Sequence, residues 1–170
     1  MALNDGVHAI PRLDINRYLG DWFEICRLPL KWEDETASNI TASYSLQTDG
    51  KIRVDNRCLD KNGQPTQAVG EASPVDDTNA KLTVTFLPAS LPWIPFTKGD
   101  YWILKLADDY SVSLVGTPNR EHLWLLARSP KLHQGIQQAY LDEALAQDFD
   151  LSNLVYPTQS GHKIEGDNFA

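Results

Sequence analysis

The chain has 170 residues, a length that fits one domain with its own hydrophobic core. Its formal net charge is −8 with four histidines, and this charge opposes binding to nucleic acid phosphates and to anionic bilayers. It contains no run of eighteen apolar residues, which argues against a membrane-spanning helix.

The chain begins with MALNDGVHAIPRLD, which lacks the charged and apolar regions of a secretory signal. We therefore expect either an intracellular protein or one from which a signal has been removed. Residues 1–11 are expected to form an N-terminal tail of one domain that covers 1–170.

After this tail the pattern becomes that of short strands, in which apolar and polar residues alternate and turn signals intervene. In NITASYSLQ, for example, Ile40, Ala42, Tyr44 and Leu46 share one face. The same pattern predicts strands at 21–29, 39–47, 51–59, about 66–73, 81–87, 100–107, 110–116 and 122–129.

The segment 87–99, LPASLPWIPFTKG, interrupts this series with four large apolar residues placed among three prolines. Proline removes a backbone donor and fixes φ, so this segment is predicted to be neither a helix nor a central strand. It is an apolar loop, and its large residues are Leu91, Trp93, Ile94 and Phe96.

The period changes to helical spacing after Ser129, where Leu132, Ile136 and Leu145 fall on one face. Ser129 is predicted as the N-cap, with Pro130 at the first helical position. We expect a helix over 130–148, a short final strand over 149–157 and a polar tail over 158–170.

Eight antiparallel strands with short connections predict an all-β fold in which an up-and-down barrel occupies 12–129. Closure removes exposed strand edges, and an eight-stranded barrel holds either side chains or one small ligand. The helix would pack outside the barrel, followed by the final strand. A two-sheet sandwich is the competing architecture from the pattern alone.

Three short stretches resemble the signatures of the lipocalin family in the expected order. DINRYLGDWFEICRLP carries the first, with Asn16, Gly20 and Trp22; LADDYSVSLV is similar to the second; and LWLLARSP, which ends near Arg128, is similar to the third. Within this family the chain resembles most the bacterial lipocalins, apolipoprotein D and the plant temperature-induced lipocalins.

This resemblance implies a cup with one closed end and one open mouth. Trp22 would close the bottom with Arg128 packed across its ring, so that Gly20, Trp22 and Arg128 are markers of the fold. The connections 30–38, 59–64, 87–99 and 116–122 would then lie at the mouth. The residues predicted for the mouth loops are Trp32, Leu91, Trp93, Ile94 and Phe96.

Strand alternation predicts which side chains line the cup and bind a ligand. These residues are Glu24, Cys26, Leu28, Ala42, Tyr44, Val54, Asn56, Ala68, Ala72, Val84, Phe86, Tyr101, Ile103, Trp124 and Leu126. Glu24, Asn56 and tyrosine hydroxyls could orient a polar head group. As a buried acid, Glu24 could also pair with an arginine or with a ligand amine. Alternatively, Glu24 is a structural residue satisfied by those hydroxyls, or the side chains fill the barrel and leave no cavity.

An elongated apolar ligand fits such a cup, because burial gains about 0.8 kcal/mol per methylene before ordering costs. We therefore predict a non-enzymatic carrier or store for a fatty acid, a lysophospholipid or a retinoid-like or sterol-like molecule. The histidine spacings match no metal site, and no cofactor is expected.

Two alternatives remain open. A pocket thiol, Cys26 or Cys58, could make the protein a lipid isomerase, although no adjacent histidine or lysine would lower its pKa. One intervening strand would hold the two cysteines about 9–10 Å apart, so both are expected to be free. The apolar loop could instead act as a lid, a transient membrane contact or a homodimer contact, leaving the protein a monomer or a homodimer.

The resemblance to bacterial lipocalins also implies a place in the cell envelope, in the periplasm or at the outer membrane, where such proteins are held by an N-terminal lipidated cysteine. No cysteine precedes Cys26 in this sequence. Such an anchor is therefore expected to be either absent or trimmed.

Overall fold

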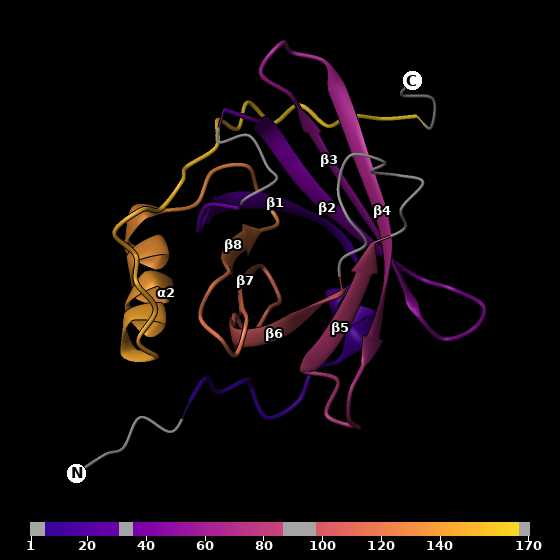
Figure 1. Ribbon diagram of the computed structural model, residues 1–170, viewed down its shortest axis with the longest axis vertical. Helices are drawn as coiled ribbons and strands as arrows, with labels where there is room; N and C mark the ends of the chain where they lie inside the picture. The colour runs from indigo at the N-terminus through magenta and orange to yellow at the C-terminus, as the bar shows by residue number, and fades with distance from the viewer. Residues whose placement is uncertain (1–5, 31–35, 87–97, 167–170) are drawn as a thin grey trace.

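Eight antiparallel strands form a closed barrel in the order of the sequence in this computed structural model, which describes residues 6–30, 36–86 and 98–166 (Figure 1). The strands are β1 (Gly20–Arg27), β2 (Ser38–Leu46), β3 (Ile52–Leu59), β4 (Pro65–Pro74), β5 (Lys81–Phe86), β6 (Lys98–Leu106), β7 (Val112–Gly116) and β8 (Leu123–Ala127). The helices are α1 (Ile15–Tyr18) and α2 (Gln134–Ala146). None of the helices in the described ranges has the length and apolar character needed to cross a membrane.

The predicted barrel is confirmed, and the sandwich alternative is wrong, because β1 and β8 are hydrogen-bonded to each other. Each predicted strand is present, with its ends moved by a few residues. The short helix α1 is an element that the alternating pattern did not predict; the side chain of Asp14 caps it by accepting from the amide of Asn16.

Strand β1 changes its partner strand along its length. Its pairing with β2 runs from Gly20–Tyr44 to Phe23–Thr41, whereas its pairing with β8 runs from Phe23–Ala127 to Arg27–Trp124. Each half of β1 therefore has one edge without a strand beside it. Arg128 covers the first edge, and the C-terminal segment covers the second.

Arg128 covers the β8 side of the first half of β1. Its guanidinium donates to the carbonyls of Asp21 (2.9 Å), Arg17 (3.0 Å) and Tyr110 (3.1 Å). Gly20 has a φ of +102°, and a Cβ added there would lie 3.2 Å from Nη1 of Arg128. The glycine of the signature is therefore needed for both its backbone conformation and the close approach of Arg128.

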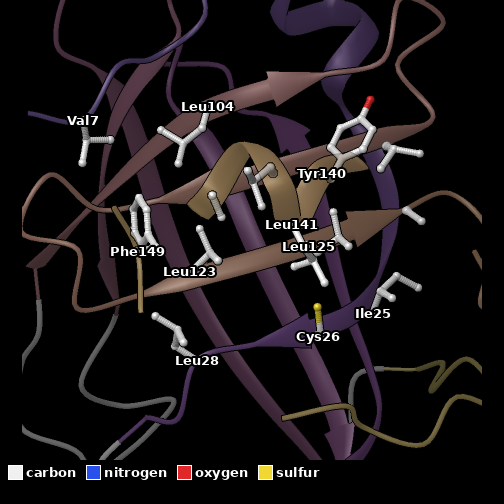
Figure 2. Packing of buried hydrophobic residues seen from close by; sticks show 14 residues of the cluster. Val7, Ile25, Cys26, Leu28, Leu104, Leu123, Leu125, Tyr140, Leu141 and Phe149 are labelled. Atoms are coloured by element: carbon white, nitrogen blue, oxygen red, sulfur yellow. The ribbon is translucent and has the colours of Figure 1, made fainter. Parts of the chain in front are cut away.

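Helix α2 packs outside the barrel, as predicted, but begins at Gln134 and not at Pro130. The cap is His133, whose Nδ1 accepts from the amide of Gly135 (3.1 Å). Ser129 cannot serve as the cap because Arg128 is still bound at the end of the barrel, so the chain needs several residues to reach the outer wall. Tyr140 and Leu141 then pack against Leu125 of β8 in one buried cluster (Figure 2).

The segment after α2 differs from the predicted strand over 149–157 and polar tail. Its sheet pairing is reduced to one bridge, in which Val155 and Arg27 exchange two backbone hydrogen bonds of 2.8 and 3.0 Å. Residues 155–166 then run along β1, β2 and β3 (yellow in Figure 1). We call residues 155–166 the C-terminal strap.

The far end of the strap is attached to an ionic cluster on the outer face of β3. Arg57 donates from Nη1 to the carbonyls of Ile164 (2.9 Å) and Gly166 (2.7 Å), and from Nε to Asp55 (3.0 Å). Burial tends to raise the pKa of Asp55, but hydrogen bonds from Arg57 and Gln67 outweigh it and hold the pKa below its usual value. Asp55 therefore stays ionised and fixes the arginine that holds the strap.

Candidate functional site

The closed end of the barrel is formed by Trp22, which is fully buried. The Cζ atom of Arg128 lies 3.8 Å from the centroid of the Trp22 ring, and Nε1 of Trp22 donates to the carbonyl of Tyr18 (2.9 Å). The predicted packing of Arg128 across Trp22 is thus confirmed. With Trp22 near the start of β1, the last residues of β1, β3, β5 and β7 lie at the opposite end.

Above Trp22, four buried or partly buried hydroxyls form a hydrogen-bonded chain. The hydroxyl of Tyr101 lies 2.9 Å from that of Tyr44 and 2.8 Å from that of Tyr18, which in turn lies 2.8 Å from Oγ of Ser113. Burial raises the pKa of Tyr18 to about 12 and also raises the pKa values of Tyr44 and Tyr101. The three tyrosine side chains therefore stay neutral, and their hydroxyls are hydrogen-bonded to one another.

An apolar pocket lies beside these tyrosines. The space left between its side chains is about 10 Å³, room for about one water molecule. Five of the residues predicted to bind a ligand line it: Tyr44, Val54, Ala72, Val84 and Tyr101. The other lining residues are Leu13, Ile15, Tyr18, Leu19, Ile52 and Leu82.

Sequence reasoning missed the contribution of the segment before β1. Leu13, Ile15, Tyr18 and Leu19 reach the cavity because this segment crosses the closed end, where Leu13 donates its amide to the carbonyl of Thr78 (2.8 Å). The apolar spacing of LDINRYLG, at three- and four-residue intervals, was the available signal.

Seven further predicted lining residues lie on the inner face at other levels. Ala42, Ile103 and Leu126 belong to the buried interior cluster, and Phe86 and Trp124 pack against it. Asn56 and Ala68 are directly paired between β3 and β4, on the same face as Val54. That these residues bind a ligand stays a prediction.

Two predicted lining residues, Cys26 and Leu28, do not line the barrel. Both pack in the cluster outside it, among side chains of β8 and α2 (Figure 2). A β-bulge between Glu24 and Cys26 shifts the register of β1 against β8, so the simple alternation from Trp22 fails beyond Glu24. The prediction for these two residues was therefore wrong.

The same bulge turns Arg27 into the barrel, where it forms an ion pair with Glu24. An arginine partner was one of the alternatives for Glu24, but the sequence did not identify Arg27 as that partner. Nη1 of Arg27 lies 3.0 Å from Oε2 of Glu24, and the two side chains are 0% and 7% exposed. Arg27 is paired with Trp124, which packs against the interior cluster. Glu24 thus faces inward as predicted, with a cationic partner rather than only tyrosine hydroxyls.

Both cysteines are free, as expected. Cys58 is half-buried, and its Sγ lies 3.0 Å from Oγ1 of Thr66. Burial, with a smaller contribution from the charge of Glu24, raises the pKa of Cys26 to about 12. Cys26 is therefore a neutral, inert thiol at physiological pH.

We expect iodoacetamide at pH 8 to modify Cys58 in the native protein and to leave Cys26 unmodified, because Cys26 is buried and its thiolate is scarce. Intact mass spectrometry and peptide mapping would show one modification before unfolding and two after it. Rapid modification of Cys26 in the folded protein would contradict this burial.

The predicted mouth-loop residues Trp32, Leu91, Trp93, Ile94 and Phe96 lie outside the described residues. Of the predicted apolar loop 87–99, only Lys98 and Gly99 are described, and they begin β6. The role of the loop as lid, membrane contact or dimer contact stays a prediction.

Comparison with known proteins identifies sequence relatives along most of the chain. The family described as "Lipocalin-like domain" matches residues 13–159. Temperature-induced lipocalin-1 of Arabidopsis thaliana is 34% identical over 157 residues, 91% of this chain and 83% of the relative. Outer membrane lipoprotein Blc of Vibrio cholerae is 33% identical over 162 residues, 94% of this chain and 90% of the relative.

A relative that matches a shorter part of the chain and a solved structure are also similar to this protein. Apolipoprotein D of Bos taurus is 35% identical over 128 residues, 70% of this chain and 62% of the relative. Insecticyanin from the tobacco hornworm Manduca sexta superposes with a TM-score of 0.70 at 22% identity, over 91% of this chain and 85% of that one. The structural likeness shows the fold alone.

Proposed function

This chain belongs to the lipocalin family, and on that premise we propose that it binds, stores or transports a fatty acid or lysophospholipid in its barrel. Members of the family are binders of small hydrophobic ligands. The observation that carries the proposal is the pocket inside the barrel, whose lining residues, from Leu13 to Tyr101, are all aliphatic or aromatic.

The walls of this cavity favour an acyl chain over a polar ligand. Its lining carries aliphatic side chains such as Val54, Leu82 and Val84, while the hydroxyls of Tyr44 and Tyr101 are engaged with each other. Each methylene buried there contributes about 0.8 kcal/mol before ordering costs. An acyl tail gains from such burial along its whole length.

The Glu24–Arg27 pair supplies a place for a polar head group. Its side chains are at most 7% exposed, and a buried ion pair contributes little to stability compared with an apolar pair of similar volume. Arg27 is the last residue of β1 and lies toward the mouth, whereas the apolar cavity lies toward Trp22. A lipid would fit both parts of the barrel if its acyl tail lay in the apolar pocket and its head group lay beside the Glu24–Arg27 pair.

Loading is proposed to occur at the mouth, through the apolar segment 87–99, which could contact a membrane transiently. One relative is named an outer membrane lipoprotein, and by analogy we propose that this chain works at a cell envelope. A homodimer formed through the same segment is compatible with this route.

A thiol-dependent isomerase is the less favoured alternative. Cys26 lies outside the barrel and has a pKa raised to about 12, so it cannot attack a ligand in the cavity. Cys58 lies on the face of β3 that carries Val54, and its sulfur lies 3.0 Å from the hydroxyl of Thr66. Activation of a thiol requires an adjacent cation, a base or a helix N-terminus.

Native mass spectrometry of the purified protein, followed by lipid extraction, tests the proposal. We expect one acyl-bearing molecule per chain, or one molecule of palmitate or palmitoyl-lysophosphatidylcholine taken up by the delipidated protein at micromolar concentration. Failure to bind any of a panel of fatty acids and lysophospholipids at these concentrations would refute it.

A further inference from the structure

The wall of the barrel has a seam between the second half of β1 and the start of β2. Direct pairing of the two strands ends at Phe23–Thr41, although β1 continues to Arg27 and β2 begins at Ser38. On its other edge, this half of β1 is paired with β8 on both sides of the bulge after Glu24. The seam therefore lies on one side of the barrel, from Glu24 to the mouth.

The C-terminal strap closes this seam. The side-chain amide of Gln159 donates to the carbonyl of Glu24 on β1 and to the carbonyl of Ile40 on β2, both at 2.8 Å. One amide group thus takes the place of a strand-to-strand hydrogen bond. Its own Oε1 is buried and has no hydrogen-bond partner among the described residues.

Further contacts hold the strap on both sides of Gln159. The amide of Asn39 donates to the carbonyl of Thr158 (2.8 Å), and Oδ1 of Asn39 accepts from the amide of Ser160 (2.8 Å). Asn39 has a φ of +52°, a left-handed conformation that places β2 out of register with β3 at this point. The start of β2 is therefore bound to the strap in place of β1.

The seam leads to the interior at the level of the polar pair. Glu24 and Arg27 hold the strap through their backbone, by Gln159 and Val155 respectively, while their side chains form the buried ion pair. Residues 155–160 close the seam through side-chain hydrogen bonds, single backbone hydrogen bonds and one bridge, whereas β1 and β8 are joined by a strand ladder with one bulge. The seam is thus the part of the wall near the polar pair that is closed without a strand-to-strand ladder.

We propose that the C-terminal strap is a latch on a side opening of the barrel, and that its release lets an acyl chain pass between β1 and β2. The use of the opening by lipid rests on the proposed function; the opening itself does not. This opening would be a second route beside the mouth, because a lengthwise slit admits a chain-like ligand sideways. Gln159 is the positioning residue of this latch.

The kinetics of ligand exchange in Gln159→Ala test the latch. Cis-parinaric acid, a fluorescent fatty acid, would be mixed with the protein in a stopped-flow instrument, and its association and dissociation rates would be measured separately. The latch affects the path by which the ligand enters and leaves, and it does not contact the bound ligand. The association and dissociation rates should therefore rise together, on the order of 10-fold, with Kd unchanged. Gln138→Ala, an exposed glutamine on α2, is the matched control and should leave both rates unchanged.

Hydrogen exchange of the native protein provides a second measurement that needs no variant and no ligand. The amides of Asn39 and Val155 should exchange faster than those within the β3–β4 ladder, and faster again in Gln159→Ala. Rates of exchange as slow as those of the ladder would overturn the latch.

The outcomes separate this inference from the proposed function. Unchanged association and dissociation rates in Gln159→Ala, or a change in Kd carried by dissociation alone, would overturn the side opening and leave the carrier intact. Absence of binding by every lipid in the panel would overturn the carrier, and the hydrogen exchange would then still decide whether the strap opens.

Discussion

Replacing Ala72 with phenylalanine will weaken the binding of palmitate on the order of 100-fold. Ala72 is 2% exposed and lines the cavity opposite Val84, its partner on β5. A phenyl ring there occupies space that the ligand needs, and displacing about four methylenes at ~0.8 kcal/mol each removes roughly 3 kcal/mol of binding free energy. Titration calorimetry on the delipidated protein would measure the loss.

The control for this prediction is Ser73→Phe, which adds the same ring one residue along β4. Ser73 is half-buried and, by alternation, faces away from the cavity. This variant should bind palmitate as the unmodified protein does. Thermal unfolding would show that both variants are folded, since overpacking at Ala72 costs about 1–3 kcal/mol of stability. Equal affinity of the two variants would show that the cavity is not the binding site.

Replacing Trp22 with alanine will lower the free energy of unfolding by about 3–5 kcal/mol, the usual cost of deleting a buried large aromatic side chain. Trp22 is fully buried, its ring lies under Arg128, and its Nε1 donates to Tyr18. The deletion leaves a hole at the closed end and removes the surface on which Arg128 rests. Urea unfolding followed by circular dichroism measures the change independently of tryptophan fluorescence.

Trp102→Ala is the matched control, because Trp102 is half-buried on the outer face of β6 beneath Lys81. It should cost less than half as much as Trp22→Ala, since part of its ring is already in water. A loss below about 1 kcal/mol in Trp22→Ala would mean that the closed end does not depend on this residue.

The strands and most of the inner face were predictable because both follow from the two-residue period of the pleat. Ala72 and Val84 face the cavity for that reason alone. Arg128 and Trp22 were predictable from the family resemblance. These features depend on short-range patterns that a single sequence displays.

Prediction from the sequence failed where the direction of a side chain depends on one extra residue in a strand, or where a segment is held by contacts with residues far away in the chain. The bulge after Glu24 has no compositional signal, yet it reverses the faces of the residues that follow. Cys26, which was expected to line the barrel, faces outward, and Arg27 faces inward and forms the ion pair with Glu24. The strap was predicted as the end of a final strand over 155–157 and a polar tail from 158. Its attachment was not predictable because its partners, Asn39 and Arg57, lie more than a hundred residues earlier.

This separation along the chain has a consequence for synthesis on the ribosome. Gln159 joins Glu24 and Ile40 from 135 and 119 residues away, and Lys163 reaches Asp21 from 142 residues away. Because translation runs from the N-terminus, β1 and β2 emerge long before the residues that join their upper ends. The seam between β1 and β2 in the nascent barrel therefore stays open until Gln159 has left the ribosomal exit tunnel.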